Sequence, residues 1–390
     1  MSTESSLSLS RRAEAVAPFL AMDVMAEAGA RERRGEGVIH MEVGQPSAPA
    51  PRAVIAAAQA ALADGRIPYT EALGMPVLRE RIVRHYAETY GVRIAPERVV
   101  VTTGSSAGFV LAFLALFDAG ARVGVPCPGY PAYHGILNAL DLIPQPMILR
   151  AEDRFAPTSA LVREVHAAKK LSGVLVMSPA NPSGTVIEPA RLAELCATAR
   201  GLRLPFISDE IYHGLSYGVP TATALQFDPD AVVINSFSKF YCMTGWRIGW
   251  MVVPDRLVRP IERLAQNLYI SAPYLSQVAA LAAFDALDEI GTVRDGYARN
   301  RALLLDALPG LGFSGIHPVD GAFYLYADIA RISNDATDFC RRMLAETGVA
   351  ATPGLDFDPG EGGHHVRFSF AGSEAACREA VGRIGGWLGR

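Results

Sequence analysis

The chain has 390 residues, of which 50% are hydrophobic and 19% are charged, and its formal net charge is −4. This composition predicts a globular protein with large buried cores and excludes an intrinsically disordered chain. Because the 36 basic residues are scattered among 40 acidic ones without polybasic runs, we expect no nucleic-acid partner.

The N-terminal residues 1–10 are rich in serine and lack the apolar core of a secretory signal, so we expect a frayed or partner-docked tail. The longest strongly apolar run, residues 109–117, is too short to span a bilayer. Five cysteines without a C-x-x-C pair indicate neither a disulfide framework nor a zinc cluster, which favours a reducing compartment. We therefore expect a cytoplasmic protein without a membrane role.

From about residue 96 onward, short β-branched runs alternate with helical stretches. This alternation predicts an α/β fold with a mainly parallel central sheet sandwiched by helices. Consecutive apolar residues in the runs are typical of strands that helices cover on both faces. Strands are expected at residues 99–101, 122–125, 174–177, 206–208 and 232–234, and covering helices at 107–117 and 189–199.

A second, smaller α+β unit is expected in the last third of the chain. A long helical stretch over residues 255–287 should leave the sheet, and further strands are expected at Phe313, 321–325 and 365–369.

The N-terminal segment is too short to hold a core alone and contains one amphipathic helix near residues 18–28. We therefore expect residues 1–48 to join the small domain. The large domain should cover residues 49–288, and the small C-terminal domain 289–390.

One lysine stands out in the second half of the chain. Lys239 lies in the run Ser236-Phe237-Ser238-Lys239-Phe240, and Arg247 follows eight positions later. Apolar neighbours desolvate an amine and favour the neutral form that attacks an aldehyde, while the serines and the arginine supply donors for a phosphate. Pyridoxal phosphate requires this combination. The other two lysines, Lys169 and Lys170, are adjacent in a polar stretch typical of a solvated helix end.

A turn between a predicted strand and an apolar helix carries a second phosphate signal. The run Thr103-Gly104-Ser105-Ser106 opens this helix, and free backbone N–H groups at a helix start attract an anion. A Gly/Ser turn alone is more often only a cap. Together with Ser236, Ser238 and Arg247, it predicts a convergent phosphate site.

Asp209 ends a predicted strand, and Tyr212 follows three residues later. A buried carboxylate there can hold a pyridine nitrogen protonated, and the tyrosine hydroxyl can bond the phenolic oxygen of the same ring. A helix N-cap is the alternative role for Asp209. Glu210 and His213 stand at the E-x-x-H spacing of a metal site, but no second ligand cluster accompanies them, so we expect no metal.

Asn181 lies in another turn that follows a strand, Ser178-Pro179-Ala180-Asn181-Pro182-Ser183-Gly184. Asn-Pro and Ser-Gly are ordinary turn sequences, and taken singly the turn interpretation is favoured. The Asn181 amide could also donate to the phenolic oxygen that Tyr212 bonds. Because ligands gather at the carboxyl ends of parallel strands, we expect these motifs to meet at one edge of the sheet.

Taken together, these residues resemble the class I/II aminotransferases, the fold-type-I family of pyridoxal-phosphate enzymes. The resemblance spans Gly44 to Arg367 and is most specific over residues 236–247. It implies that Lys239 forms a Schiff base with the cofactor and then moves a proton between the substrate Cα and the cofactor C4′. It implies that Asp209 pairs with the pyridine nitrogen, and that Tyr212 and Asn181 bond the phenolic oxygen. The residues that it assigns to the phosphate are Ser105, Ser106, Ser236, Ser238 and Arg247.

The resemblance also assigns residues around the cofactor. Tyr130 falls where the family places an aromatic ring stacked on the cofactor, with a core tyrosine as the alternative. Tyr69 matches a tyrosine that reaches the phosphate of the neighbouring subunit, which implies a homodimer with active sites at the interface. Arg367 is implied to bind the substrate α-carboxylate, Gly44 to let the backbone approach that carboxylate, and Asn181 to belong to the same substrate-binding set.

The activity that the resemblance implies is amino transfer from an L-amino acid to a 2-oxo acid by a ping-pong mechanism. Relatives selective for dicarboxylic substrates often supply a second arginine where a loose register places Asn267, which favours a neutral or aromatic donor here. A β-eliminating lyase of the same fold is the alternative. A non-catalytic regulator is disfavoured, because residues 1–43 are too short and too weakly basic for a DNA-binding module.

Overall fold

The computed structural model describes residues 8–317 and 319–389. Most of the predicted tail over residues 1–10 lies outside the described residues, and the first helix, α1 (Arg11–Glu14), follows it. Within the described ranges, no helix combines the length and the apolar character needed to cross a bilayer.

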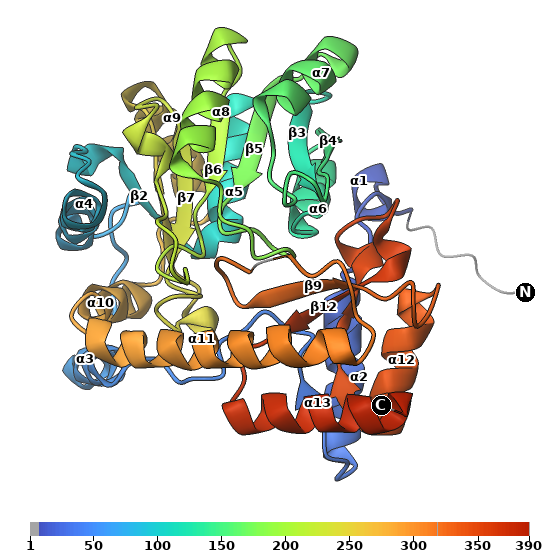
Figure 1. The fold of residues 1–390 in the computed structure, drawn as a ribbon. Helices are drawn as coiled ribbons and strands as arrows, with labels where there is room; N and C mark the ends of the chain where they lie inside the picture. The colour runs from blue at the N-terminus through green and yellow to red at the C-terminus, as the bar shows by residue number, and fades with distance from the viewer. Residues whose placement is uncertain (1–7, 318, 390) are drawn as a thin grey trace, which may run out of the picture.

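A seven-stranded sheet forms the centre of the molecule (Figure 1). Its strand order is β2-β8-β7-β6-β5-β3-β4, and every neighbouring pair is parallel except those that β8 makes with β2 and β7. The predicted α/β fold with a mainly parallel sheet is therefore confirmed. The strands are β2 (Val99–Thr102), β3 (Arg122–Cys127), β4 (Ile143–Ile148), β5 (Gly173–Met177), β6 (Phe206–Asp209), β7 (Val232–Ser236) and β8 (Gly249–Val252).

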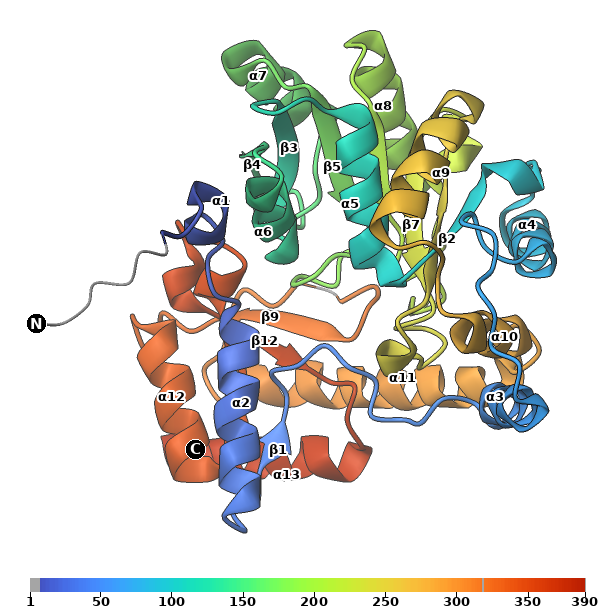
Figure 2. The same ribbon diagram turned by 180° about the vertical axis from the view of Figure 1, so that it is seen from behind.

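Helices cover both faces of the sheet (Figures 1 and 2), and alternate side chains of the strands pack into two different cores. In β5, Val174 and Val176 face one core while Leu175 and Met177 face the other. The first core includes α4 (Pro76–Tyr90), α7 (Ser159–Lys169) and α8 (Pro189–Gly201), and the second includes α5 (Gly104–Leu116), α6 (Ala132–Ala139) and α9 (Asp255–Leu268). The sequence did not predict β4, an edge strand with two prolines, nor β8.

Two smaller sheets lie beside the large one. One is antiparallel with the order β11-β12-β9, and in the other β1 pairs in parallel with β10. Helix α2, which confirms the helix predicted near residues 18–28, packs against β10 and β11 (Figure 2). The elements are β1 (Ile39–His40), β9 (Tyr324–Asp328), β10 (Val349–Ala350), β11 (Thr352–Pro353), β12 (His365–Ser369), α2 (Leu20–Arg33), α3 (Arg52–Asp64), α10 (Tyr274–Ala283), α11 (Leu287–Gly310), α12 (Ala336–Thr347) and α13 (Glu374–Leu388). The predicted domain limits, after residues 48 and 288, stay a prediction.

The prediction of one helix over residues 255–287 is wrong. Helix α9 ends at Leu268 and α10 begins at Tyr274. Between them Ile270 has a φ of 66°, which an α-helix cannot contain, and Pro273 is the N-cap of α10. The long helix is instead α11, with 24 residues.

Two strand predictions in the small unit also need correction. Phe313 lies outside the named strands, and its neighbour Ser314 forms only a single bridge with Asp328. The strand predicted over residues 321–325 begins at Tyr324, because Ala322 has a φ of 56° and belongs to the preceding turn.

Candidate active site

A cavity of about 210 Å³ lies where the carboxyl ends of β5, β6 and β7 approach β9 and β12. The turns after parallel strands converge at such an edge, so motifs that are remote in the sequence meet there. All the predicted site residues except Ser236 and Tyr69 line it. The predicted residues that line the cavity are Gly44, Ser105, Ser106, Tyr130, Asn181, Asp209, Tyr212, Ser238, Lys239, Arg247 and Arg367.

Ser236 and Tyr69 lie outside this lining. Ser236 is buried at the end of β7, where its hydroxyl accepts from the Ser238 backbone N–H at 3.0 Å and lies 2.9 Å from the Ser238 hydroxyl. It therefore fixes the turn that presents Ser238 to the cavity. Tyr69 is 79% exposed on the surface, so it does not take part in the cavity of its own chain.

Lys239 follows β7 in a turn and is partly buried. Its Nζ donates a hydrogen bond of 2.6 Å to the carbonyl oxygen of Gly44. Burial lowers the pKa of Lys239 to about 8, and the positive charges of Arg367 and Arg247 add to this effect. A substantial fraction of the amine is therefore neutral and nucleophilic near physiological pH. Lys169 and Lys170, in contrast, are exposed at the end of α7.

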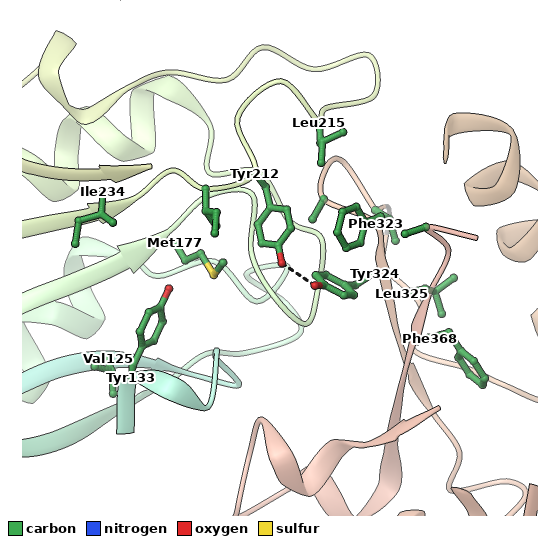
Figure 3. Packing of buried hydrophobic residues seen from close by; sticks show 14 of the residues in the cluster. Val125, Tyr133, Met177, Tyr212, Leu215, Ile234, Phe323, Tyr324, Leu325 and Phe368 are labelled. Atoms are coloured by element: carbon green, nitrogen blue, oxygen red, sulfur yellow. Dashed lines mark hydrogen bonds between the residues drawn. The ribbon is translucent and has the colours of Figure 1, made fainter. Parts of the chain in front are cut away.

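Asp209 is the last residue of β6 and is 1% exposed. Burial raises its pKa to about 6, against the opposing effects of the Tyr133 hydroxyl, the Ile211 N–H and the Lys239 charge. The Tyr133 hydroxyl donates to Oδ2 at 2.5 Å, and the Ile211 N–H donates to Oδ1 at 3.1 Å. Figure 3 shows Met177 to the left of the Tyr212 ring and Tyr133 further to the lower left. Asp209 is thus an anion at neutral pH, and it faces the cavity.

The neighbouring Glu210 and His213 form a separate buried network. The Glu210 carboxyl accepts from the Thr223 hydroxyl at 3.0 Å and from the Ala224 N–H at 2.9 Å. Burial raises the pKa of Glu210 to about 8 and lowers that of His213 to about 3. His213 Nδ1 is bonded to the Tyr90 hydroxyl at 2.7 Å. Across residues 8–317 and 319–389, no three His, Cys, Asp or Glu side chains gather in a way that could hold a metal ion.

The N-terminus of α5 and the loop after β7 form a cradle suited to an anion. Ser105 and Ser106 lie in the first turn of α5, where backbone N–H groups have no partner inside the helix. Opposite them, the Arg247 guanidinium lies against Gly104, which has a φ of 78°. A Cβ at Gly104 would be 2.4 Å from Arg247 Nη2, so only glycine keeps this approach open.

Arg367 projects from β12 and is 2% exposed. Its guanidinium contacts the rings of Tyr324 and Phe357, with its Cζ 4.4 and 4.6 Å from their centroids. Nη1 donates to Asn181 Oδ1 at 3.0 Å, and this contact leaves the Nδ2 end of the amide available as a donor. The Nε of Arg367 is buried without a partner among the described residues, which suits it to receive a carboxylate.

Two tyrosines that contact site residues, Tyr133 and Tyr324, were missed from the sequence. Tyr130 precedes α6 and Tyr133 lies in its first turn, and their ring centroids are 5.4 Å apart. Tyr324 lines the cavity, and its hydroxyl lies 2.6 Å from that of Tyr212 (Figure 3). Nothing in the sequence around Tyr324 distinguished it from a core residue of a strand.

Comparison with known proteins identifies the family to which this site belongs. The sequence pattern of the family described as aminotransferase class I and II matches residues 36–384. The chain belongs to this family. Members depend on pyridoxal phosphate, and the protein is a pyridoxal-phosphate-dependent aminotransferase.

Individual relatives support the same conclusion. The chain is 48% identical to a valine–pyruvate aminotransferase of Mycobacterium tuberculosis over 96% of its own length and 97% of that protein. A crystal structure of an aminotransferase from Mycobacterium tuberculosis superposes with a TM-score of 0.96 at 47% identity, covering 98% of this chain and 100% of the other. The aspartate aminotransferase of Thermus thermophilus, solved with maleate, gives a TM-score of 0.92 at 30% identity over 97% and 99% of the two chains. The fold-type-I architecture is therefore confirmed.

The cavity of this aminotransferase fits the cofactor. It presents one amine of lowered pKa, one buried carboxylate, an anion cradle between the first turn of α5 and Arg247, and the Arg367 Nε, which is buried without a partner among the described residues.

Proposed function

We propose that this aminotransferase moves the amino group of a neutral or aromatic L-amino acid to a 2-oxo acid in a ping-pong reaction through Lys239. The observation that carries the donor preference is the set of cations in the cavity. Within the described residues, its lining holds only Lys239, Arg247 and Arg367 as basic side chains. Each has a proposed partner in the aldehyde, the phosphate or the α-carboxylate, so no cation of this chain is left for a carboxylate on the donor side chain.

Apolar side chains complete the lining. Phe19 packs edge to face on Tyr130, with 6.0 Å between the ring centroids, and Met22 lies one turn further along α2. An apolar donor side chain would be desolvated favourably here, whereas a carboxylate would lose its hydration without a partner. The name of the valine–pyruvate relative agrees with this preference, while the Thermus relative is named for aspartate.

Each proposed role follows from the geometry of a residue. Pyridoxal phosphate, when bound, supplies an aromatic ring that takes up the electron pair released at the donor Cα. Asp209, ionised above about pH 6, would keep the ring nitrogen protonated. Tyr212 and Asn181 Nδ2 would donate to the phenolic oxygen. The phosphate would be held at the start of α5 by Ser105 and Ser106, and by Ser238 and Arg247, while Tyr130 would cover the ring.

Lys239 would move the proton between the donor Cα and the cofactor C4′. Its amine must be neutral to accept this proton, and a pKa of about 8 allows it both to accept and to return a proton near neutral pH. Arg367 would hold the α-carboxylate, with Gly44 close to the same group. A fixed carboxylate orients the Cα–H bond toward the lysine, because the donor is then held at two points.

The role of Lys239 is tested with two substitutions. We expect Lys239→Ala to keep the far-ultraviolet circular dichroism and the melting temperature close to those of the wild type, but to lose the visible absorbance band and nearly all turnover. Lys169→Ala, at the exposed end of α7, is the matched control and should keep both. Wild-type turnover in Lys239→Ala would refute the assignment.

Donor preference and reaction type are tested together. The visible band is followed while L-valine, L-alanine, L-phenylalanine, L-aspartate or L-glutamate is added, and ammonia and 2-oxo acids are assayed in parallel. Loss of the band with neutral donors and without ammonia supports the proposal. Ammonia release with recovery of the band would instead establish the β-eliminating lyase, and equal rates with L-aspartate would refute the donor preference.

We further propose that the active form is a homodimer. Tyr69 is 79% exposed, and its neighbour Thr70 donates its backbone N–H to the Ser271 hydroxyl, next to Ile270, which is 50% exposed. These two loops therefore present large apolar side chains together on the surface, which suits an interface. Tyr69 would reach the phosphate of the second subunit.

A mixing experiment tests this arrangement. Tyr69→Ala and Lys239→Ala subunits should each be poorly active, but a hybrid would contain one site with both residues intact. Recovery of activity on mixing supports the shared site, and a monomeric mass by light scattering would refute it.

We also propose a cytoplasmic location. All five cysteines are buried and unpaired, which suits a reducing compartment. Cell fractionation tests this, and recovery of the protein from an oxidising compartment would refute it.

A further inference from the structure

The side chain of Tyr324 lines the cavity and contacts several of its other lining residues. Tyr324 is the first residue of β9 and is 1% exposed. Its hydroxyl oxygen is 2.6 Å from that of Tyr212, and the two rings meet at 83° with 5.6 Å between their centroids (Figure 3). Burial raises the pKa of both phenols, so both remain protonated at neutral pH. One hydroxyl must therefore donate to the other.

The other face of Tyr324 contacts the substrate-binding part of the site. The Arg367 guanidinium carbon lies 4.4 Å from the centre of the Tyr324 ring, within the range of a cation–π interaction. The Tyr324 hydroxyl is also close to Gly44, since a Cβ built on Gly44 would be 1.7 Å from it. Gly44 is the residue whose carbonyl oxygen accepts from Lys239. Tyr324 therefore touches the neighbours of both the cofactor and the donor carboxylate.

We propose that Tyr324 is a positioning residue that acts through Tyr212 and Arg367. This inference rests on the proposed function. Its hydroxyl donates to the Tyr212 oxygen and so directs the Tyr212 hydrogen toward the phenolic oxygen of the cofactor. A Tyr212 oxygen that already accepts one bond is a stronger donor, because successive hydrogen bonds polarise each other. The Tyr324 ring separately supports the Arg367 guanidinium, whose carbon also lies 4.6 Å from the centre of the Phe357 ring.

The hydroxyl role is tested by the pH titration of the visible band in the holoenzyme. The proton that titrates is shared by the phenolic oxygen of the cofactor. A hydrogen bond donated to this oxygen competes with that proton. Removing the donor therefore raises the pH midpoint of the titration. We expect Tyr324→Phe to raise it by a few tenths of a pH unit to about one unit, and Tyr212→Phe to raise it further. If Tyr324 acts through Tyr212, the double variant matches Tyr212→Phe alone. The other ionisable groups that line the cavity are unchanged in every variant: Tyr130, Asp209, Lys239, Arg247 and Arg367.

Tyr326 provides the matched control. It lies two residues further along β9, is 4% exposed, has a buried hydroxyl without a partner among the described residues, and does not line the cavity. Tyr326→Phe should leave the midpoint unchanged. An unchanged midpoint in Tyr324→Phe, or additive shifts in the double variant, would overturn the proposal.

The ring role is tested by the donor KM. Tyr324→Phe keeps a ring over Arg367, so the KM for the amino donor should change less than about twofold. Tyr324→Leu removes the ring and should raise KM by roughly two- to thirty-fold, the range expected for losing one cation–π contact. Equal KM values in the two variants would overturn this part.

Two results separate this inference from the proposed function. A wild-type protein without a visible band after addition of pyridoxal phosphate would refute both. If the wild type has the visible band and Tyr324→Phe leaves the pH midpoint of its titration unchanged, only the role of Tyr324 is refuted. A Tyr324→Phe protein that no longer folds would make the residue structural and would also overturn the proposal.

Discussion

The hydrogen bond from Tyr133 to Asp209 predicts how tightly the protein holds its cofactor at low pH. In the folded protein the Tyr133 hydroxyl lies 2.5 Å from Asp209 Oδ2. Burial raises the Asp209 pKa and this hydrogen bond lowers it, and the result of both effects is a pKa of about 6. Hydrogen bonds to charged groups contribute roughly 1.5–3 kcal/mol, and about 1.4 kcal/mol corresponds to one pKa unit. Tyr133→Phe should therefore raise the Asp209 pKa by about one to two units.

The sign of the effect on cofactor binding follows directly. Only ionised Asp209 pairs with a protonated pyridine nitrogen, so affinity falls as the pH drops through the Asp209 pKa of the cofactor-free protein. In the wild type this decline should begin near pH 6, and in Tyr133→Phe it should begin about one to two units higher. At pH 7 the variant should bind pyridoxal phosphate roughly two- to tenfold more weakly, while at pH 9 the two proteins should differ little from this cause.

The assay is equilibrium binding of pyridoxal phosphate to cofactor-free protein, followed by absorbance across pH 5–9 for wild type and variant. Titration of the cofactor's own phosphate affects both proteins equally and cancels in the ratio of their affinities. Tyr297→Phe is the matched control, because the Tyr297 hydroxyl is buried without a partner among the described residues and lies outside the cavity. A ratio that is the same at pH 6 and pH 9 would refute the reasoning.

Three further predictions follow from the site and from the buried network of Glu210 beside it. Gly104→Ala, whose Cβ would be 2.4 Å from Arg247 Nη2 at a φ of 78°, should weaken cofactor binding by tenfold or more, whereas Gly201→Ala, with no atom near its Cβ, should bind normally in the same titration. The rate at which cofactor-free protein captures pyridoxal phosphate should rise with pH and level off above about 8, where Lys239 becomes neutral, and stopped-flow absorbance that keeps rising to pH 10 would contradict this. Because the folded-state pKa of Glu210 is raised to about 8, its contribution to stability is lost as pH rises from about 5 to 8. Glu210→Gln should flatten this part of the pH profile of the melting temperature, and an unchanged slope would show that Glu210 is already ionised.

The sequence alone predicted most of the candidate site residues and five of the seven strands of the central sheet. Lys239, Asp209 and Arg247 were identified because each residue type is needed by one part of the cofactor and lies beside a recognisable strand or turn. Consecutive apolar residues indicated the parallel strands, because a strand that is buried on both faces carries apolar side chains at every position. Local sequence therefore predicted both the strands and the groups that follow them.

The sequence failed where the local signal is weak or conflicts with tertiary packing. The break between α9 and α10 depends on Ile270 at positive φ, a conformation that β-branched residues disfavour in isolation. The strand β4 contains two prolines and exists because it pairs with β3 at the edge of the sheet. Neither feature follows from the propensity of its own residues.

Only the tertiary structure decided which side chains act on the predicted groups. Tyr133 bonds Asp209 across 76 positions, Tyr324 bonds Tyr212 across 112, and Arg367 bonds Asn181 across 186. These contacts set the protonation of the carboxylate and the orientation of the guanidinium. The first contact depends on how α6 packs on the large sheet, and the other two depend on where β9 and β12 of the small sheet lie, because a hydrogen bond forms only within a few ångströms. The candidate residues could therefore be predicted from the sequence, whereas their hydrogen-bond partners and the direction of their pKa shifts are determined by the tertiary structure.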